Sequence, residues 1–278
     1  MTIIKAIILG AVQGFAEFLP ISSSGHLVIF SHLLGTASAE GDLFFDVLLH
    51  LGTFIAVVAA FWRDILRLIL ELFSAIGDLF TGRLFKRKPT PGRNYLYMLI
   101  VSLLPLFLVL PVKDRVEALF ANPIFVGAAL LVTSAFLWFA GKIRRGRIGM
   151  AETRVGNALT VGFAQLFAIV PGISRSGATI TAGLATGFKR EYAVKFSFII
   201  SLPATLAAAA LELRETIKLG TLPDNMLPYL IGMAVAAFTG YLAIGLVKLL
   251  LKKNQFQLFS YYCLVVGLAT IIYFGLIY

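Results

Sequence analysis

The sequence predicts an all-α integral membrane protein, an inverted repeat of two units, each a re-entrant broken helix plus three transmembrane spans. Three observations support this fold class: an apolar composition, six long hydrophobic stretches and a motif that occurs twice. Hydrophobic residues make up 59% of the 278 residues and charged residues 14%, about half the charged share of a soluble domain. We treat residues 1–278 as a single membrane domain, with repeat unit one over approximately 1–150 and repeat unit two over approximately 151–278.

The repeated motif is the most specific feature of the chain. Residues 10–25 read GAVQGFAEFLPISSSG and residues 162–177 read GFAQLFAIVPGISRSG, and eight of the sixteen aligned positions are identical. Each copy is an apolar run broken by Pro and a Ser/Gly cluster, and it is shorter than the roughly 20 apolar residues that cross a bilayer as a helix. We therefore expect two re-entrant helices. Irregular polar backbone at membrane depth needs protein or a watery cavity around it, so a site is expected where the two copies meet.

Six stretches are long and apolar enough to cross a bilayer, and a further segment is amphipathic. Residues 64–80 carry Arg67, Glu71 and Asp78 among apolar residues. We expect this segment to lie at the membrane interface or to pack beside the bundle. The expected spans are roughly 44–62, 94–110, 123–140, 196–213, 226–247 and 256–277.

The loops between the spans differ in charge, and this difference predicts the orientation. The basic loops hold Arg83, Lys86, Arg87, Lys88, Arg93, Lys142, Arg144, Arg145, Arg147, Lys189, Arg190, Lys248, Lys252 and Lys253. The other connections carry Glu40 and Asp42, a balanced set over 113–117 and a near-neutral stretch over 212–224. Because positive loops stay in the cytoplasm, the first motif copy is expected to enter from outside and the second from the cytoplasm. The net charge of +10 then indicates orientation and contact with anionic membrane lipids, with no nucleic acid partner.

Polar residues at the two breaks predict a phosphate site. Ser is a favoured N-cap, so helices that start near Gly25 and Gly177 would point free backbone N–H groups into the breaks, where they attract anions. Arg175 lies between two of the serines, and its planar fork of donors matches phosphate oxygens. The competing explanation for small residues of this kind is tight helix packing. The expected substrate-binding residues are Gln13, Ser22, Ser24, Gly25, Ser174, Ser176 and Gly177.

Glu17 and His26 are the expected acid and base residues. Glu17 follows Gln13 by four residues and shares its helix face, whereas His26 begins the helix after the break. The first copy therefore supplies acid/base chemistry and the second copy the anion clamp. The two copies differ at the aligned pairs Glu17/Ile169, Ser23/Arg175 and His26/Ala178.

The remaining histidines and the one cysteine are expected to have supporting roles. His32 is expected to be structural, and His50, which follows Asp46 within a span, to pack or to support the site. Cys263 has no second cysteine with which to form an intrachain disulfide. No Cys/His cluster in the sequence has the spacing of a structural zinc site.

At these residues the sequence resembles the undecaprenyl pyrophosphate phosphatase family, the bacitracin-resistance type of bacterial membrane phosphatase. The resemblance is carried by QGFAEFLPISSSGH (13–26), FDVLLHLGT (45–53) and PGISRSGAT (171–179) and runs through most of the chain. It implies hydrolysis of a lipid-linked pyrophosphate to the monophosphate, which recycles the carrier lipid for cell-wall polymers. It also implies an active site that opens toward the outer face of the plasma membrane and a dependence on a divalent cation.

The family's first motif is a pair of acidic or amide residues four apart. Here Gln13 takes the first position, so Glu17 is the one motif carboxylate for metal binding or base work. A Mg²⁺ or Ca²⁺ ion would be held partly by Glu17 and largely by substrate oxygens and water.

The expected catalytic residues are Glu17, Ser23, His26 and Arg175, and the sequence leaves His26, Ser23 and water open as the attacking group. The partner is a polyprenyl pyrophosphate lipid whose tail stays in the membrane. The alternative function is a carrier or flippase for an anionic polyprenyl lipid, because opposed broken helices also occur in transporters. Small residues at 207–210 would permit a homodimer.

Overall fold

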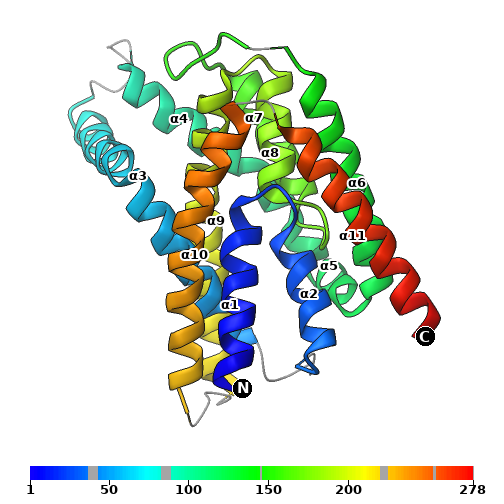
Figure 1. Cartoon of the computed structure of the whole chain (residues 1–278). Coiled ribbons are helices and arrows are strands. Elements are labelled where there is room, and N and C mark those ends of the chain that lie inside the picture. Colours follow the sequence, from blue (N-terminus) through cyan, green and yellow to red (C-terminus); the bar gives the residue numbers. More distant parts are fainter. Residues whose placement is uncertain (37–42, 83–88, 145, 220–224, 253–254, 278) are drawn as a thin grey trace.

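The computed structural model describes residues 1–36, 43–82, 89–144, 146–219, 225–252 and 255–277, and these residues are all-helical apart from one isolated bridge between Ile148 and Phe188 (Figure 1). The elements are α1 (Ile3–Phe18), α2 (Ser23–Leu33), α3 (Leu43–Phe80), α4 (Pro91–Leu103), η1 (Leu104–Val112), α5 (Lys113–Ala118), η2 (Leu119–Ala121), α6 (Pro123–Lys142), α7 (Val155–Phe167), α8 (Arg175–Ala185), α9 (Arg190–Leu219), α10 (Leu227–Lys252) and α11 (Phe256–Ile277).

Six helical segments of the described chain are long and apolar enough to cross a membrane, as the sequence predicted. They are Phe44–Phe80, Pro91–Val112, Pro123–Lys142, Arg190–Lys218, Leu227–Leu250 and Phe256–Leu276. Large apolar side chains also cover the outside of the bundle; Phe107, Phe238 and Leu276 are each more than 60% exposed. The chain is therefore a multi-pass membrane protein, because such a surface is stable against lipid rather than water.

The loop charges behind the predicted orientation are only partly described. Lys142, Lys189 and Arg190 lie in described segments. Outside the described residues lie Glu40, Asp42, Arg83, Lys86, Arg87, Lys88, Arg145, Asp224 and Lys253.

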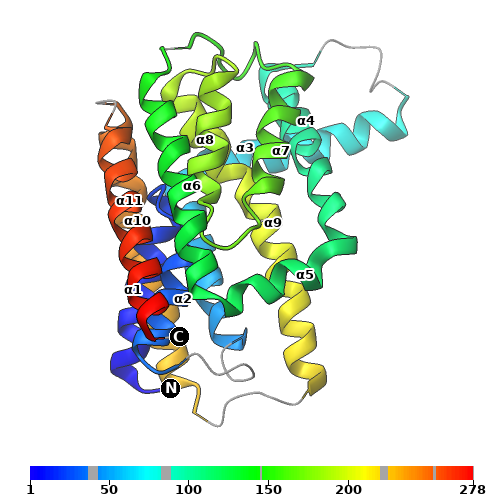
Figure 2. The same ribbon diagram turned by 90° about the vertical axis from the view of Figure 1, so that its right-hand side faces the viewer.

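The four helices of the motif copies, α1, α2, α7 and α8, form two hairpins that approach each other from opposite ends of the bundle. Residues 19–22 join α1 to α2, and residues 168–174 join α7 to α8. Figures 1 and 2 show both connecting segments near mid-height, and Ser176 Oγ donates to the carbonyl oxygen of Leu19 at 3.4 Å. The longest of the four, α1, has 16 residues, or roughly 24 Å at 1.5 Å per residue, which is less than the ~30 Å hydrocarbon core. The two motif copies therefore break and meet.

One glycine in each motif copy lets its hairpin pack closely against a helix from the other half of the chain. A Cβ on Gly10 would lie 2.5 Å from the carbonyl oxygen of Gly232 in α10, and a Cβ on Gly162 would lie 2.4 Å from that of Ser102 in α4. Such spacing leaves no room for a side chain, and close backbone approach at small residues is how membrane helices pack tightly. The two halves of the chain are thus interlocked.

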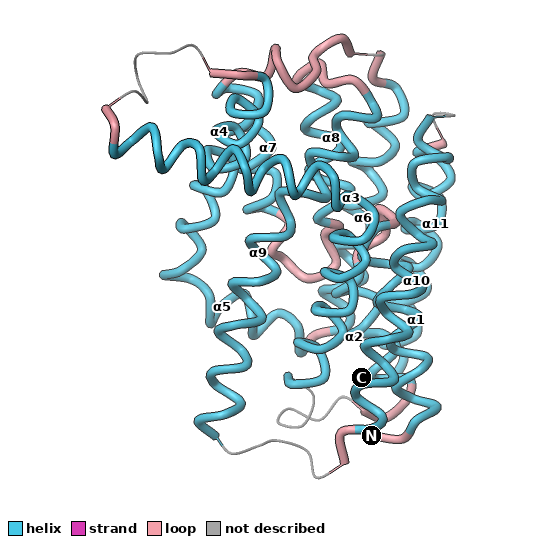
Figure 3. The backbone as a smooth tube through the Cα atoms, turned by 90° about the vertical axis from the view of Figure 1, so that its left-hand side faces the viewer, coloured by secondary structure: helices cyan, strands magenta, loops and turns pink. Residues whose placement is uncertain are grey.

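The third helix, α3, bends at the point where the sequence predicts the end of a span. Phe61 has φ −127° and ψ 23°, and beyond it the helix runs out across one end of the bundle (Figure 3). Arg93 at the start of α4 holds this amphipathic arm, because its guanidinium pairs with Glu71 at 3.1 Å and Asp78 at 3.2 Å. Arg93 therefore ties this arm to α4, and the placement of the arm at the membrane interface or beside the bundle stays a prediction.

The second span is not α-helical throughout. After α4 ends at Leu103, the chain continues as the 3-10 segment η1, which contains Pro105 and Pro111. Proline lacks the N–H that an α-helix needs and clashes with the preceding turn, so the stretch winds more tightly. Buried Pro105 lies against α7 near Gly162, where the second hairpin is seated.

Candidate active site

The first break is built around a strained serine. Ser22 caps α2, because its Oγ accepts from the backbone N–H of Gly25 at 3.2 Å. Its φ is 72°, the one positive value on a non-glycine residue in the described chain, and such a conformation costs on the order of 1–3 kcal/mol. His26 holds it there: the backbone N–H and the ring Nδ1 of His26 both bond the Ser22 carbonyl oxygen, at 3.1 and 2.8 Å.

The second break has a matching cap and a different support. Ser174 caps α8, because its Oγ accepts from the backbone N–H of Gly177 at 3.0 Å. Glycine takes the positive φ here, at Gly172, with φ 92°. Thr133 of α6 donates to the Gly172 carbonyl at 2.8 Å and accepts from the Ser174 N–H at 3.0 Å. Helices α2 and α8 begin at Ser23 and Arg175. Each start lies two residues before the glycine, Gly25 or Gly177, near which the sequence predicted it.

Three of the predicted catalytic residues meet between the breaks. The buried carboxylate of Glu17 accepts from Ser23 Oγ at 2.5 Å and forms an ion pair with Arg175. It also accepts from Gln13 Nε2 at 3.0 Å, which confirms that Gln13 and Glu17 share one helix face. Arg175 donates further to Thr205 of α9 at 3.3 Å. A hydroxyl, a carboxylate and a guanidinium therefore form one connected cluster drawn from both motif copies.

The predicted binding serines are arranged alike at the two breaks. Ser22 and Ser24 hydroxyls lie 3.3 Å apart, and those of Ser174 and Ser176 lie 3.2 Å apart. Each pair flanks the first turn of a helix of 11 residues. The free N–H groups of both first turns are therefore accompanied by hydroxyl donors, a combination that suits the oxygens of an anion.

Gln13 is buried, and its Oε1 has no hydrogen-bond partner among the described residues. This oxygen and the Glu17 carboxylate are the kind of ligand that Mg²⁺ and Ca²⁺ take. No group of three His, Cys, Asp or Glu residues in the described chain would hold a metal by itself. The residues therefore fit a divalent cation that takes most of its ligands from a bound phosphate and water, and few from the protein.

His26 lies at the break, but both of its ring nitrogens are engaged away from Glu17. Besides the Nδ1 contact with Ser22, Nε2 lies 2.8 Å from the hydroxyl of Tyr262 in α11. The two rings are nearly parallel, with centroids 5.6 Å apart. The imidazole therefore supports the backbone of the break in this arrangement.

The other histidines have similar local bonds. Nδ1 of His32 lies 2.8 Å from the Val28 carbonyl, and the ring of His32 packs edge-on to Phe274. Nδ1 of His50 lies 2.8 Å from the Asp46 carbonyl. A local backbone bond therefore orients His50 within α3, whereas His32 is part of the packing.

Sequence reasoning missed three residues that hold the site: Thr133, Thr205 and Tyr262. Each is a hydroxyl residue inside a long apolar helix, on α6, α9 and α11 respectively. Nothing in the local sequence distinguishes such a residue from one that bonds its own helix backbone. Only the packing of distant helices gives these residues their partners.

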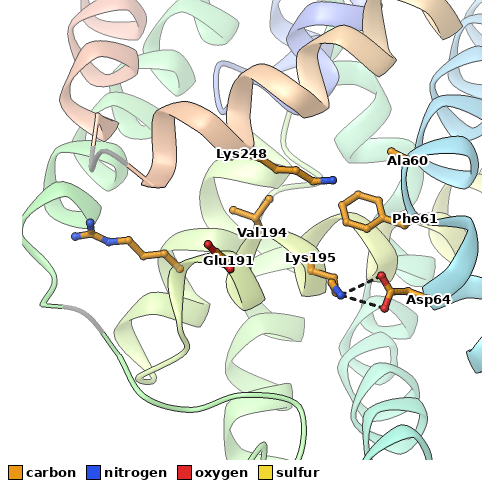
Figure 4. Close-up of a pocket in the computed structure, with 8 residues that line it drawn as sticks. Ala60, Phe61, Asp64, Glu191, Val194, Lys195 and Lys248 are labelled. Carbon is orange, nitrogen blue, oxygen red and sulfur yellow. Dashed lines mark hydrogen bonds and ion pairs between the residues drawn. The ribbon is translucent and has the colours of Figure 1, made fainter.

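A pocket of about 280 Å³ lies apart from this cluster, at the bend of α3 (Figure 4). There Lys195 pairs with Asp64 at 3.0 Å, and the Lys248 ammonium lies over the Phe61 ring at 4.0 Å. None of the predicted site residues lines this pocket. Its charged groups brace the bend of α3.

Comparison with known proteins identifies the family to which the chain belongs. The family model described as bacitracin resistance protein BacA matches residues 6–269. An undecaprenyl-diphosphatase of Methanosphaera stadtmanae is 41% identical over 276 residues, which is 98% of each chain. That of Methanobrevibacter smithii is 41% identical over 96% of each chain, and that of Alkaliphilus metalliredigens is 40% identical over 98% of this chain and 99% of its own. The chain therefore belongs to the BacA family of bacitracin resistance proteins.

Proposed function

We propose that this chain is an undecaprenyl-diphosphatase, which hydrolyses undecaprenyl pyrophosphate to undecaprenyl phosphate and inorganic phosphate and so recycles the lipid carrier for cell-wall synthesis. The observation that carries the proposal is the cluster of Ser23, Glu17 and Arg175 between the two breaks. The relatives that bear this name match nearly the whole chain, including both motif copies.

The pyrophosphate would bind where the two first turns meet. The N–H groups of α2 and α8 and the hydroxyls of Ser24 and Ser176 are donors at that point. Phosphate oxygens would compete with Glu17 for the Arg175 guanidinium, and this exchange would free the carboxylate to act as a base. The prenyl tail would remain in the surrounding lipid.

Ser23 is the attacking group that this geometry favours. Its hydroxyl already donates to Glu17, whereas both nitrogens of His26 are engaged elsewhere. Ser23 Oγ would attack the terminal phosphorus and pass its proton to Glu17, while the bond to the bridging oxygen breaks and the lipid monophosphate leaves. Water would then attack the phosphoserine, the Ser23 oxygen would recover its proton from Glu17, and inorganic phosphate would depart with the protons of the water.

Arg175 would stabilise the charge that develops on the transferred phosphoryl group. Phosphoryl transfer depends mainly on positioning and charge neutralisation. Glu17 and Gln13 Oε1 would be the protein ligands of a Mg²⁺ or Ca²⁺ ion, which would neutralise further charge on the substrate.

The test is phosphate release from a long-chain prenyl pyrophosphate by the purified protein in detergent. We expect turnover by the wild type and a loss of about 10²–10³-fold or more in Glu17→Gln, Ser23→Ala and Arg175→Ala. Ser31→Ala in the same helix as Ser23 is the matched control and keeps its activity. A folded wild type that releases no phosphate with Mg²⁺ or Ca²⁺ would leave the carrier function as the better explanation.

A second measurement identifies the attacking group. Substrate labelled in its terminal phosphate is quenched within the first turnover, and the protein is digested. Label on a peptide at Ser23 supports the proposed step, label on His26 assigns the attack to the imidazole, and an unlabelled protein assigns it to water.

We also propose that the two motif copies are re-entrant elements of an inverted repeat, with the site open to the outer face of the plasma membrane. The paired contacts of Gly10 and Gly162 support the repeat, and the basic loops support the orientation. The relatives include archaeal proteins, so the proposal concerns the plasma membrane of either a bacterium or an archaeon. Single cysteines placed beside Asn94 should be protected from impermeant reagents in intact cells; reactivity there would reverse the orientation.

A homodimer through α9 is a further proposal. Ala207, Ala208 and Ala210 are exposed on that helix, and small residues permit close helix contact. Mass measurement in detergent should give twice the chain mass, and Ala208→Trp should give the monomer.

A further inference from the structure

We propose that Tyr262 is a positioning residue of the site: through His26 it holds Ser22 in its strained conformation and thereby directs Ser23 toward Glu17. The catalytic consequence rests on the proposed hydrolysis, whereas the chain of contacts stands on its own geometry. Neither motif copy contains Tyr262, which lies 236 residues from His26.

The direction of each hydrogen bond follows from the chemistry of the partners. A carbonyl oxygen only accepts, so the Nδ1 that lies 2.8 Å from the Ser22 carbonyl must carry the proton. In a neutral imidazole Nε2 is then an acceptor, and the Tyr262 hydroxyl at 2.8 Å must donate to it. The Ser22 carbonyl therefore fixes the tautomer of His26, and Tyr262 holds the opposite side of the ring in its orientation.

The bond from His26 supports the one backbone conformation that needs support. Ser22 is the non-glycine residue with positive φ in the described chain, and a strained conformation persists only where its surroundings over-determine it. Two donors from His26 converge on its carbonyl. Because Ser23 is the next residue, a change at Ser22 would turn its hydroxyl away from Glu17.

Helix α11 is itself firmly placed against the bundle near Tyr262. The hydroxyl of Ser260 donates to the Ser134 carbonyl of α6 at 2.8 Å, and Ser134 donates back to the Ser260 carbonyl at 2.8 Å. The Sγ of Cys263 also lies 3.9 Å from the Pro20 carbonyl at the break. The paired helices α6 and α11 thus hold Tyr262 in place, and its hydrogen bond to His26 ties the first break to them.

The kinetic test compares Tyr262→Phe with Tyr261→Phe, which removes a hydroxyl from the neighbouring residue of the same helix. The exposed fractions of the two residues are 43% for Tyr262 and 59% for Tyr261. Loss of one positioning hydrogen bond should lower kcat about tenfold and leave KM nearly unchanged, because Tyr262 does not touch the substrate. Tyr261→Phe should match the wild type. In a His26→Gln background, Tyr262→Phe should have no further effect. A Tyr262→Phe enzyme with wild-type kcat, or one that loses the same factor in both backgrounds, would overturn the inference.

A spectroscopic test is independent of turnover. The chain has three histidines, so ¹⁵N-labelled imidazoles give three sets of resonances, and His26→Gln assigns one of them. In Tyr262→Phe we expect the His26 nitrogens to shift, and those of His32 and His50 to stay. Unchanged His26 resonances would refute the contact even if the wild type were inactive, whereas an inactive wild type with shifted His26 resonances would count against the hydrolysis alone.

Discussion

The two breaks share a backbone plan and differ in the side chains they carry. In each, a serine caps the second helix and a glycine three residues later donates to the cap. The first break adds Glu17 and Ser23, and the second adds Arg175. In the proposed mechanism, one copy therefore carries the base and the attacking hydroxyl, and the other carries the guanidinium that binds the phosphate.

The breaks also differ in how they are supported. The second places a glycine where φ is positive and satisfies its backbone with Thr133. The first places Ser22 in that region and needs His26 and Tyr262 to hold it. Both breaks are held by other helices, but the break next to the proposed attacking group is the one that also carries backbone strain, and strain tends to collect in functional sites.

The largest expected effect removes the clamp from the second break. Arg175→Ala should lower kcat/KM about 10²–10³-fold, the scale of one lost donor to a developing negative charge. Arg175→Lys should recover only part of this, because an ammonium lacks the planar fork. Phosphate release measures both variants, with exposed Arg154→Ala as the control for net charge. If Arg175→Ala retained more than a tenth of the activity, the division of labour between the breaks would be wrong.

The next effect tests whether the two halves pack alike. Gly10→Ala and Gly162→Ala each force a methyl group against a carbonyl oxygen less than 3 Å away, and each should destabilise the fold by about 1–3 kcal/mol. Thermal denaturation in detergent measures this loss. Gly156→Ala, which has nothing within 4 Å of its Cβ, should not lower stability. Destabilisation at only one of the two glycines would argue against a structural repeat.

A smaller effect separates the two caps. Ser22→Ala and Ser174→Ala each remove a capping hydroxyl, which costs about 1 kcal/mol. Glycine tolerates positive φ and alanine does not, so Ser22→Gly should be more stable than Ser22→Ala. At Ser174, where φ is −71°, glycine should give no such advantage. Equal stability of the Ala and Gly variants at both positions would remove the evidence for strain at Ser22.

The sequence was informative wherever a local pattern determines the structure. Span length and hydropathy predicted six crossings. The N-cap preference of serine predicted serine caps near Gly25 and Gly177, and the structure places them at Ser22 and Ser174. The four-residue spacing predicted that Gln13 and Glu17 share one helix face, and their side chains are hydrogen-bonded. Local patterns could not reveal which of Ser23 and His26 faces the carboxylate, because that depends on the φ of Ser22. Nor could they reveal Tyr262, whose partner lies in another part of the chain.

The smallest expected effect concerns Gln13, the amide that lies beside the Glu17 carboxylate in the first motif copy. Gln13→Glu would place two carboxylates four residues apart, and like charges at this spacing repel. A divalent cation would relieve this repulsion and gain a second carboxylate ligand, so the variant should need a lower concentration of Mg²⁺ or Ca²⁺ for half-maximal phosphate release, by at least about twofold. Gln257→Glu makes the same chemical change at an exposed position on α11 and should leave the cation requirement unchanged. A Gln13→Glu enzyme with the cation requirement of the wild type would place the metal away from Gln13 and Glu17, and the first break would then supply only the base.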